Sequence, residues 1–128
     1  MPDVSWPLQQ AVHARLTGQI TTPVYDHVPA DATMSYVVIG EDTVSSEDDK
    51  TGALHRVTLT LHVWSRHRGR KEVKQILGEV YTALHQAPLV VSGFDLLWIR
   101  FDFEDSFIDA DGITYHGVQR YRCLLAST

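Results

Sequence analysis

The sequence lacks the features of a secreted, membrane-bound or disulfide-stabilised protein. Cys123 is the single cysteine among 128 residues, which excludes an internal disulfide and a multi-cysteine zinc site. No run of about 18 apolar residues is present, and residues 1–4 lack the basic start and apolar core of a signal peptide. We therefore expect no membrane partner and a chain that stays in the cytoplasm unless an assembly carries it elsewhere.

A surplus of basic residues is also missing. The chain has 11 Lys and Arg against 16 Asp and Glu, a net charge of −5. A general nucleic-acid binder needs an excess of cations to contact phosphates, so this class is disfavoured. Hydrophobic residues at 44% and charged residues at 21% are ordinary globular values. The composition predicts one domain, residues 1–128, that buries about two-thirds of its unfolded surface.

The charges that are present are unevenly distributed. Residues 41–50, the acidic segment, have a local net charge of −4, and residues 66–74, the basic segment, have one of +4. Two patches of opposite sign suit self-association or binding to other proteins, and the alternative is two solvated loops. If subunits close head to tail, we expect the acidic segment of one subunit to face the basic segment of its neighbour.

The clearest periodicity runs from residue 57 to residue 84. Apolar residues alternate with other residues from Val57 to Trp64, which predicts a half-buried strand. After the basic turn, apolar residues from Val73 to Leu84 recur at i, i+3, i+4, i+7 and i+8, which predicts an amphipathic helix from about residue 69 to 85. This unit builds a scaffold and contains no arrangement suited to catalysis.

The remaining patterns complete an α+β domain. Ser5 is a good N-cap for a first helix that ends near Thr17, before Gly18. Strands are predicted at 36–42, 53–64, 96–104 and 113–125. We expect a small, mostly antiparallel four-stranded sheet packed against two main helices. Residues 43–52 are acidic and aperiodic, which predicts a mobile loop between two strands.

The faces to which the side chains point predict the register of the last two strands. Directly paired residues must share a face of the sheet. A three-residue turn, 110–112, satisfies this rule, because it places Asp102 opposite Arg120 and Phe101 opposite Tyr121. A two-residue turn would pair residues whose side chains point to opposite faces of the sheet. We therefore predict the three-residue turn.

The polar face of this hairpin mixes both signs of charge and is nearly neutral. Unpaired cations in a channel for DNA would grip the phosphates and hinder passage. We therefore expect this face at a subunit contact or under another element. Its charged residues are Arg100, Asp102, Glu104, Arg120 and Arg122.

The sequence contains only weak motifs for catalysis or metal binding. Asp109-x-Asp111-Gly112 resembles part of a calcium loop, but Phe107 stands where a ligand is required, so the motif predicts a turn. Cys123 lies in an apolar strand pattern, which predicts a small buried hydrophobe. We expect no catalytic residue, no cofactor and no metal. The alternative from another class is a small metal-dependent hydrolase or nuclease that uses His62, His116 and Asp102.

Several short sequence motifs follow one another over nearly the whole chain. A first helix is followed by Val24-Tyr25-Asp26-His27-Val28-Pro29, Tyr36-Val37-Val38-Ile39-Gly40, Leu59-Thr60-Leu61-His62-Val63-Trp64-Ser65-Arg66, Gly69-Arg70-Lys71-Glu72 and Leu84-His85. The most specific stretch is Asp111-Gly112-x-Thr114-x-His116-Gly117-Val118-x-Arg120-Tyr121-Arg122. In this order and spacing, the chain resembles the phage tail-completion or tail-terminator family of long, non-contractile tails and gene-transfer particles.

The resemblance implies a homohexameric ring that caps the tail tube at its head-proximal end. Such a ring stops polymerisation of the tube protein and offers a surface to the neck proteins of the head, while DNA only passes through its lumen. The expected location is the tail of a virion or phage-like particle, and the host cytoplasm during assembly. Another neck or adaptor ring is the alternative within this class.

The resemblance carries over no catalytic residues and no individual contact residues. The candidate interface residues are therefore those of the two charged segments and of the polar hairpin face. They are Glu41, Asp42, Glu47, Asp48, Asp49, Arg66, Arg68, Arg70, Lys71, Lys74, Arg100, Asp102, Arg120 and Arg122.

Overall fold

The computed structural model describes residues 3–48, 50 and 52–128, which form two helices and a five-stranded sheet. The elements are α1 (Ser5–Gln19), β1 (Val24–Tyr25), β2 (Tyr36–Ser46), β3 (Leu54–Ser65), α2 (Lys71–Leu84), β4 (Phe94–Ile108) and β5 (Tyr115–Ser127). The strand order is β1-β2-β3-β5-β4, with β1 parallel to β2 and the other pairs antiparallel.

The predicted α+β class is confirmed, but the predicted count of four strands is wrong. The fifth strand is β1, which pairs Val24 with Val37 and Tyr25 with Val38. The sequence predicted a short extended piece at residues 24–29, but two paired residues are too few to show a period of two, so it was not counted as a strand of the sheet.

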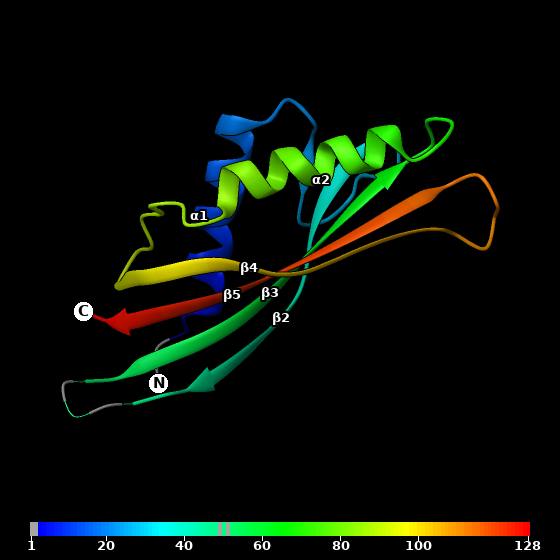
Figure 1. The fold of residues 1–128 in the computed structure, drawn as a ribbon. Helices are drawn as coiled ribbons and strands as arrows, with labels where there is room; N and C mark the ends of the chain where they lie inside the picture. The colour runs from blue at the N-terminus through cyan, green and yellow to red at the C-terminus, as the bar shows by residue number, and fades with distance from the viewer. Residues whose placement is uncertain (1–2, 49, 51) are drawn as a thin grey trace.

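Both helices pack against one face of the sheet and against each other (Figure 1). Helix α2 lies over β3, β4 and β5, while α1 lies over β1 and β2. One continuous core fills the space between these layers, with Leu16, Leu61 and Leu77 almost fully buried. The opposite face of the sheet, the open face, carries no helix. In the described part of the chain, neither helix is long and apolar enough to cross a membrane.

Helix α1 differs from its prediction at both ends. Val4 occupies the N-cap position without a side-chain cap, and Ser5 is the first helical residue. The Ser5 hydroxyl instead donates a hydrogen bond to Asp42 of β2. Gly18 lies inside the helix, which ends at Gln19, because the Ile20 backbone N–H still bonds to the Leu16 carbonyl.

The predicted loop at 43–52 is largely a hairpin. Strand β2 continues to Ser46 and pairs Thr43 with Thr58 and Val44 with Val57. A shift of register between Ile39 and Asp42 makes this continuation possible. Such a bulge adds one residue to β2, so each residue after it points to the opposite face from the one that simple alternation predicts. The sequence pattern therefore does not show that the strand continues. Residues 49 and 51 of the predicted loop lie outside the described residues.

The turn between β4 and β5 is longer than the predicted three residues. Ile108 pairs with Tyr115, and the Asp109 N–H donates to the Thr114 carbonyl at 2.8 Å. The predicted pairing of Phe101 with Tyr121 is nevertheless confirmed, because a second bulge corrects the register between Phe101 and Phe103.

Asp111 organises this turn and does not form part of a calcium loop. Its carboxylate accepts hydrogen bonds from the Ile113 N–H at 2.9 Å and the Thr114 N–H at 2.8 Å. The Thr114 hydroxyl donates to the same carboxylate at 2.5 Å, and these three bonds lower the pKa of Asp111. The prediction of a turn is confirmed.

The bulge at Asp102 also exchanges the faces of the two residues that follow it. Phe103 now pairs with Arg120 and lies on the open face, whereas Glu104 pairs with Gln119 on the helix side. The prediction that Glu104 shares a face with Arg120 is therefore wrong. The Gln119 amide donates to Glu104 at 2.7 Å and to the Leu77 carbonyl at 3.0 Å, which fixes β4 and β5 to α2.

Candidate functional site

Asp102 is the centre of an arginine cluster on the open face. Its Oδ2 atom accepts a hydrogen bond from the Nε of Arg120 at 2.9 Å, and its Oδ1 atom forms an ion pair with the Nε of Arg122 at 3.2 Å. The Arg120 guanidinium lies over the Phe103 ring at 5.1 Å, and Arg100 lies over the ring of Trp98 at 4.2 Å. The predicted proximity of Asp102 to Arg120 is thus confirmed, but their predicted direct pairing across the strands is wrong, because Asp102 lies in the bulge and Phe103 pairs with Arg120.

The bulge leaves the net charge of the polar hairpin face as predicted, because it turns Glu104 to the helix side and brings Asp105, which pairs with Val118, to the open face. The arginine cluster itself consists of Arg100, Arg120 and Arg122 around Asp102, a net charge of +2. The two arginines in contact with Asp102 have side chains that are 43% and 55% exposed. The cluster therefore offers accessible cations to an acidic partner.

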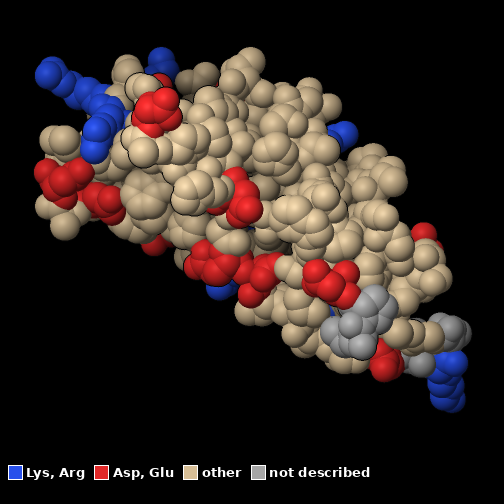
Figure 2. Space-filling view, turned by 180° about the vertical axis from the view of Figure 1, so that it is seen from behind, with Lys and Arg blue, Asp and Glu red and all other residues tan. Residues whose placement is uncertain are grey.

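The acidic and basic segments lie at opposite ends of the molecule (Figure 1). The described residues of the acidic segment lie in the second half of β2 and after its end at Ser46, and the basic segment forms the β3–α2 loop and the first turn of α2. Figure 2 shows acidic side chains in a band along the molecule and a group of basic side chains at one end. One molecule thus presents two segments of opposite net charge at its two ends, and acidic side chains also lie between them.

Contacts within the subunit already engage part of the acidic segment. Glu47 forms an ion pair with Arg56 at 2.5 Å, and both side chains remain largely exposed. Asp48 accepts from the Leu54 N–H at 3.3 Å. Asp49 lies outside the described residues.

The basic segment is anchored at only a few points. Arg66 donates to the Thr114 hydroxyl in the β4–β5 turn at 3.3 Å, and Arg70 lies 5.7 Å from the ring centre of Tyr115. Among the described residues, no ion pair engages Arg68, Lys71 or Lys74. These three cations extend into solvent, where they are available to a partner.

His62 and His116 meet on the open face, as the metal-site hypothesis requires, but Asp102 does not join them. The His62 Nδ1 and the His116 Nε2 are 2.8 Å apart, and the His116 ring stacks on Trp64 with centroids 3.8 Å apart. Glu41 accepts from the His62 Nε2 at 2.7 Å. Within the described residues, no group of three or more His, Cys, Asp or Glu side chains could hold a metal ion.

Sequence reasoning missed the contact between Glu41 and His62. Glu41 lies in the β2 bulge, where two residues of β2 oppose Thr60, so the alternation of faces cannot place its side chain. Gly40 is required beside it, because a Cβ atom there would lie 2.6 Å from the His62 ring. A glycine next to an acid at the end of an apolar strand was the only local signal.

The histidine pair predicts a pH-dependent stability. Burial, and then the charge of His62, lowers the pKa of His116 below its ordinary value of 6.5, although Asp109 and Glu41 oppose this shift. The folded protein therefore binds a proton less readily than the unfolded chain, so the free energy of unfolding should fall as the pH drops below 6.5. Urea unfolding at about pH 7.5 and about pH 5.5 measures the effect.

The variant His116→Gln should lose part of this pH dependence. His27→Gln, at an exposed position, is the control and should retain it. An unchanged difference between the two pH values in His116→Gln would show that the pair does not contribute.

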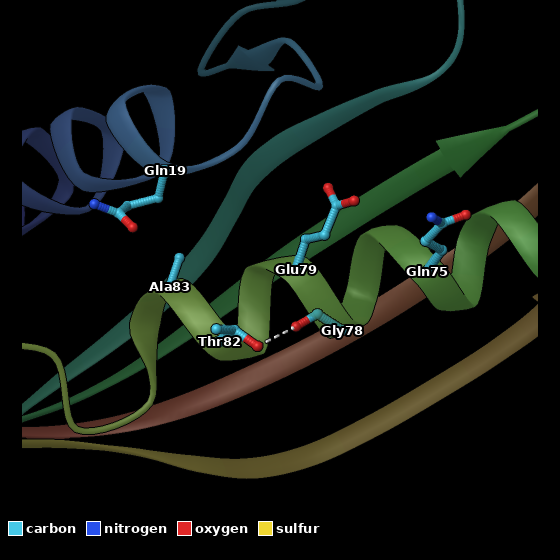
Figure 3. Close-up of a pocket in the computed structure, with 6 residues that line it drawn as sticks. All are labelled: Gln19, Gln75, Gly78, Glu79, Thr82 and Ala83. Carbon is cyan, nitrogen blue, oxygen red and sulfur yellow. Dashed lines mark hydrogen bonds between the residues drawn. The ribbon is translucent and has the colours of Figure 1, made fainter.

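One surface pocket in the described part of the chain contains a single ionisable group. This pocket of about 370 Å³ lies between the end of α1 and α2 and is lined by Gln19, Gln75, Gly78, Glu79, Thr82 and Ala83 (Figure 3). The Thr82 hydroxyl in it is directed to the Gly78 carbonyl at 3.0 Å, and Glu79 is its single ionisable group. Cys123 is fully buried, as predicted, and burial raises its pKa to about 12, so it is not an activated nucleophile.

Three comparisons with known proteins agree with one another. The family model described as "Tail completion protein gp17" matches residues 9–126. "Tail completion protein gp17" of Bacillus phage SPP1 is 31% identical over 87 residues, which cover 68% of this chain and 64% of that protein. The match thus spans less than two thirds of that relative. A chain of the solved structure "Virion of native gene transfer agent (GTA) particle" has a TM-score of 0.91 and 25% identity, covering 99% of this chain and 100% of that one.

Proposed function

Because the chain belongs to the tail completion protein gp17 family, we propose that it is a structural protein of a phage-like tail and forms the terminator ring of that tail. The resemblance noted in the sequence is confirmed at the level of the family. The observation that carries the proposal is the fold, which matches a chain of a gene transfer agent virion over the full length of both.

In this proposal, the protein forms a homohexameric ring at the head-proximal end of the tail tube. One ring face binds the last layer of the tube protein and stops its polymerisation, the other binds the neck protein of the head, and DNA passes through the lumen. A ring built by rotation needs two different surfaces on each subunit that fit each other. The acidic and basic segments make the two ends of one subunit differ in charge, which supports a head-to-tail contact.

A structural role also fits the geometry better than an enzymatic one. The residues of the metal-hydrolase hypothesis are divided between two places, with Asp102 bound to arginines and His62 bound to His116. The remaining alternative, another neck or adaptor ring, differs in where it would bind along the tail.

The direct test is the polymerisation of the tube protein from the same particle. We expect the purified protein to shorten the tubes in a dose-dependent way and to be found at one end of each tube by electron microscopy. A neck or adaptor ring would leave tube length unchanged. Size-exclusion chromatography with light scattering gives the stoichiometry, and a monomer at every concentration would contradict the ring.

A further inference from the structure

Among the described residues, the two margins of the sheet each contain one stretch of strand without a neighbouring strand. We propose that residues 102–108 of β4 in one subunit pair with residues 40–46 of β2 in the next, so that the sheets join into one continuous sheet around the ring. This inference rests on the proposed ring and names the surface through which it closes.

The open stretch of β4 is its second half. In the first half, the Ile99 carbonyl accepts from the Gln86 N–H at 2.9 Å, and the Phe101 N–H donates to the His85 Nδ1 at 3.0 Å. The loop after α2 thus covers this part of the edge. Beyond Phe101, the described residues provide no backbone hydrogen bond to the outer edge of β4.

The backbone groups that point away from β5 follow from this geometry. Phe101 points outward, and the bulge at 102 shifts the alternation by one residue. The free N–H and C=O groups therefore belong to Glu104, Ser106 and Ile108. An unpaired edge of this length is a template for pairing with another chain.

The open stretch of β2 is also its second half. Strand β1 covers β2 only at Val37 and Val38, and the Val37 N–H donates to the Pro23 carbonyl at 2.8 Å. The bulge after Ile39 again shifts the alternation. The outward groups are then those of Asp42, Val44 and Ser46, which agrees with the inward bond from the Glu47 N–H to the Leu54 carbonyl.

These two stretches fit each other in direction and register. Each strand is antiparallel to its neighbour in the order β2-β3-β5-β4, so β2 and β4 of one subunit run in opposite directions. Rotation about a ring axis along the sheet does not reverse the strands, so β4 of one subunit is also antiparallel to β2 of the next. If every outward residue of the β2 stretch pairs with an outward residue of the β4 stretch, Val44 lies opposite Ser106. Because the open stretches lie at opposite ends of the sheet, each subunit is staggered relative to the next, as the tilted strands of a closed barrel require.

Apolar side chains along these edges are also partly exposed. Val44 is 38% exposed on one edge, and Phe103, Phe107 and Ile108 are 39–42% exposed on the other. The pairing brings these apolar groups to a subunit boundary, where their burial contributes most of the affinity.

Charge supports the same arrangement. The stagger brings the tip of the β2–β3 hairpin, with Glu47 and Asp48, to the arginine cluster of the neighbour. That cluster has a net charge of +2 on exposed side chains, so it complements the acidic tip. This also places the polar hairpin face at a subunit contact.

Proline substitution tests the strand pairing. Ser106→Pro and Val44→Pro each remove an outward N–H that bonds only to the neighbouring subunit. We expect each variant to keep the circular dichroism of the folded subunit and to raise the concentration for half-assembly by about tenfold or more. The matched controls, Ser106→Ala and Val44→Ala, keep the N–H, and Ser106→Ala should assemble like the unmodified protein.

A cysteine pair tests the register, since Cys123 is buried. Under oxidation, Val44→Cys with Ser106→Cys should give covalent ladders up to the full ring, whereas either single variant should give none, because the contact is heterologous. If the unmodified protein forms rings but both folded proline variants assemble equally well, the strand pairing is wrong and the ring stands. If the unmodified protein forms no ring, both proposals fail.

Discussion

Leu77→Ala is expected to lower the free energy of unfolding by about 2–5 kcal/mol, because it leaves a cavity between α2 and the sheet. Leu77 is 1% exposed and packs on β5 directly over Gly117. A Cβ atom built on Gly117 would lie 2.9 Å from the Leu77 Cδ1, closer than real Cβ atoms come to a neighbour. Gly117 therefore provides the space that the leucine fills. Urea denaturation of the purified subunit measures the loss.

The close contact makes the two positions dependent on each other. Gly117→Ala alone should cost about 1–3 kcal/mol, because the added methyl group collides with a buried side chain. In the double variant, the methyl group enters the space that Leu77→Ala vacates, so the total loss should be smaller than the sum of the single losses. Lys74→Ala, at an exposed position of the same helix, is the control and should change stability little. Additive losses would show that the helix does not approach β5 this closely.

Reversing the charge of the acidic tip is expected to weaken the ring about tenfold in half-assembly concentration. Glu47→Lys with Asp48→Lys replaces attraction to the arginine cluster of the neighbour by repulsion. Exposed ion pairs contribute only about 0.2–1 kcal/mol each and are screened by salt, so the effect should shrink as salt is raised. Sedimentation velocity at two salt concentrations measures it.

A compensating reversal identifies the partner of the acidic tip. Adding Arg100→Glu to the tip variant should restore part of the assembly, because opposite charges then face each other again. The alternative is that the tip faces the basic segment, as the charge pattern of the sequence suggests. In that case Arg68→Glu, Arg70→Glu and Lys71→Glu would restore assembly and Arg100→Glu would not, which would contradict the inferred strand pairing. If neither set restores it, the tip faces the tail tube or the neck.

Several features of this protein follow from the sequence alone. The alternation from Val57 to Trp64 and the helical spacing from Val73 to Leu84 identify β3 and α2, because each carries an uninterrupted apolar period. The alternating hairpin residues also predict that Asp102 approaches Arg120. The order of short stretches, with His116-Gly117 among them, indicates the family. The signals for β3 and α2 each lie along one continuous stretch of chain, whereas the family is indicated by the order of several separate stretches.

Which side chains share a face of the sheet could be determined only from the tertiary structure. Two bulges, one at Gly40 and Glu41 and one at Asp102, each add a residue to a strand and invert the alternation beyond it. They bring Glu41 to His62 and turn Glu104 toward the helices. The two strands that contain them, β2 and β4, also continue beyond their predicted ends. A bulge is fixed by the pairing of its strand with a neighbour distant in sequence, so the period of a single strand cannot locate it. The same pairing determines which backbone groups remain free at the two margins of the sheet.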